Sequence, residues 1–467
     1  MAMAQAATKW PAGFSCRCPL YPNCPSSMPP HKISSTDSLE TRVEKTLVIE
    51  DATDAIKKLG AGPQPPSTDQ LDYEKGTSTI AWVLKMLLRF KSAKDLVSTR
   101  LSLPTNLLHP TSQLEFWNYN DRPDLMASLS DPEDSLDRFL GVVRWWYSKD
   151  TKWKTNTMCK PFNPILGERF LCEWRTLVAQ PPGHNGVVEP KHVTVQGIQE
   201  QISHHPPVCA YYYDCPEKGV VIRGLDQIMA RFTGTQLKVG PGECNHGIYV
   251  TLTKRDEEYL LTHPWASVAG FITGSLYITV SETTVIVCPK TGLKAVLEYK
   301  PEPFFGRPKF AIEGKIFRHD YKADEGLTEK ERKESEKLAK IPESLVLATV
   351  SGQWNGRVYF RKTGEDHDTL LFDMTESEVA RKIVKPIGDQ DPLESQRVWG
   401  GVTSAMLEED FQTATKLKRQ LEDEQRALSR GRNEPFVSSY FRFELPPLEP
   451  ATPESIRSME GGKPYLK

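Results

Sequence analysis

The sequence predicts an α+β protein that is mainly β, in which one large antiparallel sheet closes into a near-complete barrel. From about residue 165 to 375, short segments rich in β-branched and aromatic residues follow one another, separated by Gly, Pro, Asp or Asn turns. Many consecutive strands of this type favour a single closing sheet over several small ones. The chain has 467 residues and a hydrophobic content of 38%, which is enough for a large core.

The strand segments begin with HVTVQGIQEQ (192–201), PVCAYYYD (207–214) and GVVIRGLDQ (219–227) and end with LVLATVSGQWNGRVYF (345–360). A charged insertion, DEGLTEKERKESEKLAK (324–340), interrupts them, and we expect a solvated loop or helix there. Residues 111–148 have a helical pattern, and a long charged helix is predicted from about Gln396 to Arg430.

Four parts follow one another along the chain. Residues 1–70 are rich in Pro, Ser, Thr and Ala and are predicted to be a disordered head. Within the second part, residues 76–100, apolar side chains at helical spacing from 78 to 91, together with Lys85 and Arg89, predict a short basic amphipathic helix. The barrel domain with its helical additions is expected over 101–445, and residues 446–467 form a tail.

Charge and composition exclude several classes of protein. A formal net charge of −2 gives no global attraction to nucleic acid, so anion binding must come from local clusters. We find no apolar run long enough for a transmembrane helix and no signal peptide at the N-terminus, so a cytoplasmic protein is expected. The nine cysteines are scattered, which favours reduced thiols over a disulfide framework.

The string EQISHHPP (200–207) contains the adjacent histidines His204 and His205. Neighbouring residues of an extended strand point to opposite faces, so two metal ligands from this pair would converge poorly. Ser203 lacks the GxSxG context of a hydrolase nucleophile. Two readings remain open: histidines satisfied by local hydrogen bonds, or imidazoles that donate to an anion such as phosphate.

Two further strings carry charged side chains in defined settings. In KPFNPILGERF (160–170), Lys160 and Asn163 lie in a Pro-stiffened segment that suits phosphate binding, or equally a surface turn. In KLKRQLEDEQRALSR (416–430), Lys418, Glu422 and Arg426 fall on one stripe of a helix. That stripe alone would be explained by ordinary exposed salt bridges.

Taken together, the strings resemble the oxysterol-binding protein family. EQISHHPP is similar to the family's EQVSHHPP, KPFNPILGE to its KPFNPxLGE, and LEDEQR with Lys418 upstream to its late K-x3-E-x3-R helix. DPLESQRVW (391–399) resembles the stretch just before that helix, and the resemblance covers about residues 76–445. The absence of a preceding PH domain is similar to the family's short form.

The resemblance implies a barrel around a hydrophobic lipid tunnel, with an N-terminal helical lid and C-terminal helices. It implies no enzyme activity, no cofactor and no metal. The protein would instead extract phosphatidylinositol 4-phosphate and exchange it for a second lipid, a sterol or phosphatidylserine, while associating peripherally with anionic membrane surfaces. The alternative is a lipid sensor or regulator that binds the same lipids without bulk transport.

The resemblance also implies roles for individual residues. The phosphoinositide headgroup would be bound by Lys160, Asn163, His204, His205, Lys418, Glu422 and Arg426. The lid, which could also touch membrane, would present Ile80, Trp82, Val83, Leu84, Lys85, Leu87, Leu88 and Arg89. Leu103 and Leu107 would lie at the tunnel entrance, and Glu168 matches a family position without an assigned role.

Overall fold

The computed structural model describes residues 87, 96, 108–154, 160–178, 191–204, 206–271, 276–303, 307–324, 326–432, 436–444 and 463–466. Their helices are α3 (Gln113–Phe116), α4 (Pro123–Ala127), α5 (Ser135–Ser148), α6 (Glu329–Ser335), α7 (Ser395–Leu407) and α8 (Phe411–Gly431). Short 3-10 helices lie at Thr151–Trp153, Tyr321–Asp324, Leu338–Lys340, Glu343–Leu345 and Ile387–Asp389. The strands are β1 (Leu108–Ser112), β2 (Lys160–Phe162), β3 (Arg169–Val178), β4 (Lys191–His204), β5 (Pro207–Cys215), β6 (Val220–Phe232), β7 (Leu237–Pro241), β8 (Ile248–Leu252), β9 (Glu257–Leu261), β10 (Trp265–Ala269), β11 (Tyr277–Cys288), β12 (Leu293–Tyr299), β13 (Ala311–Arg318), β14 (Val346–Gln353), β15 (Arg357–Lys362), β16 (Thr369–Asp373), β17 (Phe441–Glu444) and β18 (Lys463–Leu466).

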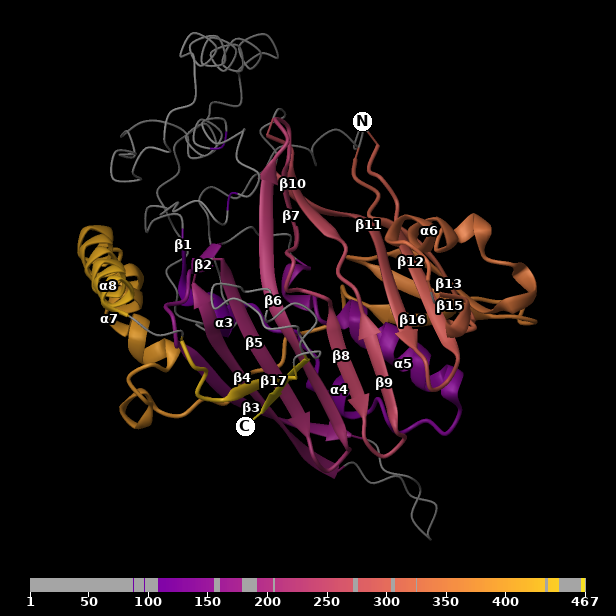
Figure 1. The fold of residues 1–467 in the computed structure, drawn as a ribbon, viewed down its shortest axis with the longest axis horizontal. Helices are drawn as coiled ribbons and strands as arrows, with labels where there is room; N and C mark the ends of the chain where they lie inside the picture. The colour runs from indigo at the N-terminus through magenta and orange to yellow at the C-terminus, as the bar shows by residue number, and fades with distance from the viewer. Residues whose placement is uncertain are drawn as a thin grey trace, which may run out of the picture.

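One 14-stranded sheet dominates the molecule (Figure 1). It runs from β16 at one edge to β3 at the other, in the order β16-β15-β14-β13-β12-β11-β10-β7-β6-β5-β4-β3, with β8 and β9 paired between β6 and β11. Neighbouring strands are antiparallel, as in β3 with β4 and β12 with β13. The mainly β fold with one large antiparallel sheet is therefore confirmed.

Helix α5 lies against the inner face of this sheet and fills much of the core. Asp134 starts the helix, because its side chain accepts hydrogen bonds from the Leu136 and Asp137 amides at 2.9 and 3.0 Å. Phe139 and Trp146 are fully buried. The Trp146 indole donates to the Tyr299 hydroxyl of β12 at 2.9 Å, so the helix is tied to the strands as well as packed on them.

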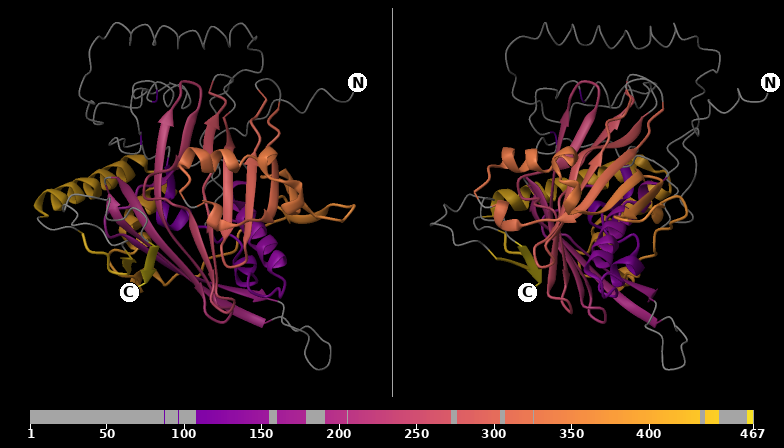
Figure 2. Two further views of the ribbon diagram at one scale, coloured as in Figure 1. Left: turned by 45° about the vertical axis from the view of Figure 1, so that its right-hand side comes forward. Right: turned by 90° about the vertical axis from the view of Figure 1, so that its right-hand side faces the viewer.

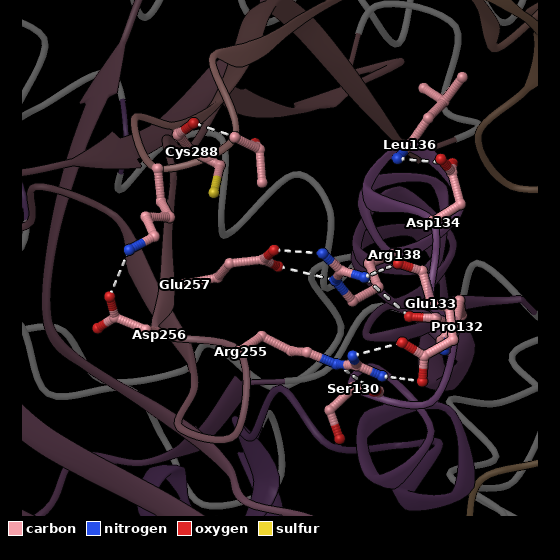
Figure 3. A network of polar contacts seen from close by, with 12 residues as sticks. Ser130, Pro132, Glu133, Asp134, Leu136, Arg138, Arg255, Asp256, Glu257 and Cys288 are labelled. Atoms are coloured by element: carbon pink, nitrogen blue, oxygen red, sulfur yellow. Dashed lines mark hydrogen bonds and ion pairs between the residues drawn. The ribbon is translucent and has the colours of Figure 1, made fainter.

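A polar network fixes the start of α5 to the β8–β9 hairpin (Figure 3). The guanidinium of Arg138 meets the carboxylate of Glu257 through two hydrogen bonds, and both side chains are buried. The same guanidinium donates to the Pro132 and Glu133 carbonyls at 2.9 and 2.6 Å. Because nearly every donor of a buried charge is satisfied, this pair holds the helix in one position.

Helices pack on both edge strands of the sheet, and backbone hydrogen bonds cover part of the β3 edge. Helix α4 packs on β3 and α5 packs on β16, and Figure 2 shows these helices lying against the curved sheet from two further directions. Along the free side of β3, Glu173 exchanges backbone hydrogen bonds with Ile383, and Arg169 donates to the Leu393 carbonyl. Covered edges leave few unpaired backbone groups for association with other chains.

Two helical predictions were wrong in detail. The segment 111–148 contains the end of β1 and three separate helices, and the predicted helix from Gln396 to Arg430 is broken into α7 and α8. At the break Glu409 adopts φ 61°, a left-handed conformation that stops a helix. Asp410 then starts α8 by accepting from the Thr413 amide at 3.0 Å. The charged insertion contains the fully exposed helix α6, as expected.

Most of the predicted lid lies outside the described residues. This applies to Ile80, Trp82, Val83, Leu84, Lys85, Leu88 and Arg89, to Leu103 and Leu107 of the predicted tunnel entrance, and to the predicted head and most of the tail. Leu87 is described, is helical and is 3% exposed. Within the described ranges, no helix is both long and apolar enough to cross a bilayer.

Candidate functional site

The KPFNPILGE string forms strand β2 and the turn that follows it. Strand β2 pairs with β1 in parallel, with Leu108 opposite Lys160. The Lys160 ammonium donates to the Asn163 side-chain oxygen at 2.7 Å, so two predicted site residues contact each other. Phe162, between them, is fully buried and stacks on Trp399 of α7 at a ring distance of 4.5 Å. The buried Phe162 therefore fixes the backbone that carries Lys160 and Asn163.

Glu168 ends the same string as a fully buried hydrogen-bond acceptor. Its carboxylate accepts from the Ser395 hydroxyl at 2.7 Å, the Trp399 indole at 2.9 Å and the Ile165 amide at 2.9 Å. The Ser112 hydroxyl is a further donor to it. Burial raises the pKa of Glu168, and these hydrogen bonds oppose that rise. Glu168 thus links β1, the β2 turn and helix α7 at one point.

A backbone ladder joins this string to EQISHHPP. The Gly167 amide donates to the Gln201 carbonyl at 2.9 Å, and the Gln201 amide donates to the Glu168 carbonyl at 2.8 Å. Gly167 has φ 81°, a conformation that side chains rarely adopt, which explains the glycine at this position. The two strings are therefore adjacent in space although they lie apart in the sequence.

Glu200 and the Ser203 hydroxyl fix the end of strand β4. The Glu200 carboxylate is fully buried and accepts from the Ser438 hydroxyl and from the Ser439 amide at 2.9 Å. The Ser203 hydroxyl donates to the Pro206 carbonyl at 2.7 Å, which closes the turn into β5. His204 lies at this turn, half-buried, three residues beyond Gln201, and His205 lies outside the described residues.

The predicted helix stripe is part of α8. The Lys418 ammonium lies 2.6 Å from a carboxylate oxygen of Glu422, and the side chain of Lys418 is buried, which is unusual for lysine. Arg426 lies one turn further on, 3.8 Å from the other Glu422 oxygen and 2.5 Å from Asp423. In Figure 1 the helices α7 and α8 lie beside β1 and β2.

Electrostatics connects Lys160 to this helix. The pKa of Lys160 falls to about 8, first because the ammonium is desolvated and then because Lys418 repels it, while the Glu422 carboxylate partly offsets both effects. Packing also brings the two elements together, because Phe162 and Ile165 of the string share one apolar cluster with Ala414 of α8. Lys160, Asn163, Lys418 and Glu422 therefore form one cluster, which we call the mouth cluster.

Of the remaining predicted site residues, Arg426 adjoins the mouth cluster, 3.8 Å from Glu422. His204 lies three residues along β4 from Gln201, which pairs with the turn at Gly167. His205 lies outside the described residues. No role was predicted for Glu168 or Glu200, whose buried carboxylates hold the elements together. Both glutamates lie inside strings that match the family, but the serines that donate to them, Ser112, Ser395 and Ser438, could not be predicted from sequence spacing.

The described residues contain no group of three or more His, Cys, Asp and Glu side chains placed to hold a metal ion. The five described cysteines, Cys172, Cys209, Cys215, Cys244 and Cys288, form no disulfide with one another. The chemistry of this region thus rests on amines, an amide, an imidazole and carboxylates.

Comparison with known proteins decides the family. The sequence model described as oxysterol-binding protein matches residues 84–460, which is most of the chain. The chain belongs to the oxysterol-binding protein family. Oxysterol-binding protein-like protein 1 of Schizosaccharomyces pombe is 31% identical over 485 aligned residues, covering 85% of this chain and 92% of the relative. Oxysterol-binding protein-related protein 9 of Mus musculus is 30% identical, covering 75% of this chain and 45% of the relative.

Solved structures of this family share the fold. The Osh1 ORD domain in complex with ergosterol superposes with a TM-score of 0.56 at 19% identity, covering 92% of this chain and 95% of that one. The Osh3 ORD of Saccharomyces cerevisiae in complex with PI(4)P gives a TM-score of 0.53 at 18% identity, covering 76% and 86%. The oxysterol-binding protein family was thus correctly identified from its strings.

Proposed function

We propose that this protein is a lipid carrier that extracts phosphatidylinositol 4-phosphate and exchanges it for a second lipid between membranes. The observation that carries the proposal is the pair Lys160 and Lys418. Lys418 is buried and Lys160 is half-buried, and repulsion from Lys418 adds to the desolvation that lowers the pKa of Lys160. A phosphate between them would remove that repulsion, because a phosphomonoester carries a charge of about −1.5 to −2 near neutral pH.

The other residues of the site fit the same ligand. Asn163 supplies an amide group beside Lys160, Arg426 a further cation, and Glu422 an acceptor for inositol hydroxyls. His204 and His205 would donate to the 4-phosphate from the end of β4, and the anion would favour their charged forms. A protein of net charge −2 can therefore still bind a strongly anionic headgroup.

The barrel interior is the proposed place for the acyl chains and for the second lipid, a sterol or phosphatidylserine. Family membership supports an apolar ligand, and the solved relatives bind ergosterol, in Osh1, and PI(4)P, in Osh3. The proposal involves no catalytic step and needs no cofactor, and it places the protein in the cytoplasm, in peripheral contact with membranes. A lipid sensor that binds without transport is the alternative.

Transfer between two liposome populations tests the proposal. We expect wild-type protein to extract labelled phosphatidylinositol 4-phosphate and deliver it to acceptor liposomes, and the His204→Ala/His205→Ala variant to lose extraction. His192→Ala is the matched control, because His192 is exposed at the opposite end of the same strand. Extraction that survives in the double variant would overturn the assigned site.

The remaining outcomes separate the alternatives. Binding without transfer would favour the sensor, and degraded lipid after long incubation would show an enzyme. Mass spectrometry of lipids that co-purify with the protein from cells would identify the second lipid.

A further inference from the structure

Strands β6, β7 and β10 form an extension of the sheet with a distinct outer face. In Figure 1 they reach past the ends of β8 and β9. The β6–β7 turn is closed by the Thr233 amide, which donates to the Gln236 carbonyl at 2.9 Å. On β6, Ile222 and Asp226 point into the core, so the odd-numbered Arg231 points outward.

Strand register brings three side chains together on this outer face. Arg231 lies opposite Lys238 across the β6–β7 pair, and Lys238 lies opposite Ser267 across the β7–β10 pair. Trp265 is two residues from Ser267 on β10 and therefore shares its face. The Arg231 guanidinium lies over the Trp265 ring, 4.6 Å from its centroid. We call Arg231, Lys238 and Trp265 the rim patch.

Gly240 leaves room for the side chain of Trp265. A Cβ atom on Gly240 of β7 would lie only 2.4 Å from the indole of Trp265. Any other residue would therefore push the ring away, whereas glycine lets the indole lie flat against the strand. Trp265 and Lys238 are half-buried, and Arg231 is exposed.

The rim patch carries two positive charges that no acidic side chain of the described residues neutralises. In the described chain, no carboxylate lies within ion-pair distance of Arg231 or Lys238, whereas most other basic side chains of the sheet surface have such a partner, as Arg223 has Glu258. An indole flanked by cations suits a lipid surface. The ring can lie at the boundary between headgroups and acyl chains, while the cations interact with anionic headgroups.

We propose that the rim patch docks onto an anionic lipid surface, an inference that rests on the proposed lipid-carrier function. Its position supports this occupant. The Leu96 amide donates to the carbonyl of Ala230, the residue before Arg231, at 2.6 Å, so one residue of the segment 76–100, predicted as lid and approach to the tunnel, is tied to the same strand. Docking here would therefore bring Leu96 close to the membrane during lipid exchange.

The test is co-sedimentation with phosphatidylcholine vesicles that contain or lack phosphatidylserine. Each cation near an anionic surface contributes about 1 kcal/mol, so Arg231→Ala/Lys238→Ala should bind the anionic vesicles about 30-fold more weakly. Trp265→Ala should weaken binding to both kinds of vesicle. Thermal unfolding checks that each variant is folded. If Trp265→Ala fails to fold, the Arg231→Ala/Lys238→Ala variant still tests the proposal.

Arg381→Ala/Lys385→Ala is the matched control, because it removes the same charge from exposed positions beside the edge strand β3. Equal loss in the control, or unchanged binding by the rim variant, would overturn the proposal. Binding of a short-chain soluble phosphatidylinositol 4-phosphate distinguishes a failure of the rim patch from a failure of the lipid-carrier function. The rim variant should bind it as wild type does, since this ligand needs no vesicle, whereas wild-type protein that cannot bind it would refute the carrier function itself.

Discussion

The indole of Trp399 donates a hydrogen bond of 2.9 Å to the carboxylate of Glu168, although 231 positions separate the two residues. The same buried carboxylate accepts from Ser395 and from the Ile165 amide. Helix α7 is thereby fixed to the turn that carries Lys160 and Asn163, and α8 follows from α7. The geometry of the mouth cluster thus depends on Glu168, a buried residue that is not itself part of the cluster.

Glu168→Gln should therefore reduce both stability and headgroup binding. An amide offers only one acceptor oxygen and points its NH2 group at donors that the carboxylate had satisfied. We expect the free energy of unfolding to fall by about 1–3 kcal/mol, the cost of leaving buried polar groups unpaired. Chemical denaturation and binding of short-chain phosphatidylinositol 4-phosphate measure the two effects.

The exposed Glu376→Gln is the control for Glu168→Gln. If the Glu168 variant matched this control in both stability and affinity, the linking role of Glu168 would be refuted. Reduced stability with unchanged affinity would show that the mouth cluster does not depend on this link.

Binding of the phosphoinositide should weaken above about pH 8. The pKa of Lys160 in the free protein is about 8, and a bound phosphate raises it because the anion favours the ammonium form. Binding in this range takes up a proton, so affinity should fall by at most about tenfold for each further pH unit. Isothermal titration calorimetry across this range measures the trend.

Lys160→Arg is the matched variant, because arginine keeps its charge throughout this pH range. Its affinity should stay nearly constant where that of the wild type falls. An identical decline in both proteins would assign the pH dependence to another group.

The sheet could be predicted from the sequence because local patterns determine it. Segments such as PVCAYYYD and GVVIRGLDQ combine β-branched or aromatic residues with turn residues at their ends, and they form β5 and β6. The strings around Lys160, His204 and Lys418 could likewise be recognised, because each is a short contiguous motif. Local information was sufficient in these cases.

Other features depend on contacts that no local pattern reveals. The break at Glu409 interrupts a sequence whose helical periodicity is otherwise continuous, and it occurs because α7 and α8 pack around a shared apolar cluster that includes Trp399 and Ala414. The buried pair Arg138–Glu257 joins residues 119 positions apart. Long-range pairing of this kind is set by the tertiary fold, so spacing could not predict it.

Asp226 should make the stability of the protein fall as pH rises toward neutrality. Its carboxyl group points into the core, accepts from the Tyr119 hydroxyl at 2.7 Å, and has a pKa raised to about 7 by burial. Between the ordinary pKa near 4 and about pH 7, the folded protein holds a proton that the unfolded chain has released. The free energy of unfolding therefore decreases with rising pH across this window, by up to about 1.4 kcal/mol per unit, and levels off above it.

Asp226→Asn tests this assignment, because the amide cannot ionise and its oxygen can still accept from Tyr119. Urea unfolding of the variant should show a weaker pH dependence than that of the wild type, so the stability of the variant relative to the wild type should rise between about pH 4 and 7. Asp389→Asn, at an exposed position, should retain the wild-type slope. Parallel curves for the Asp226 variant and the wild type would mean that this carboxyl group does not bind a proton in the core.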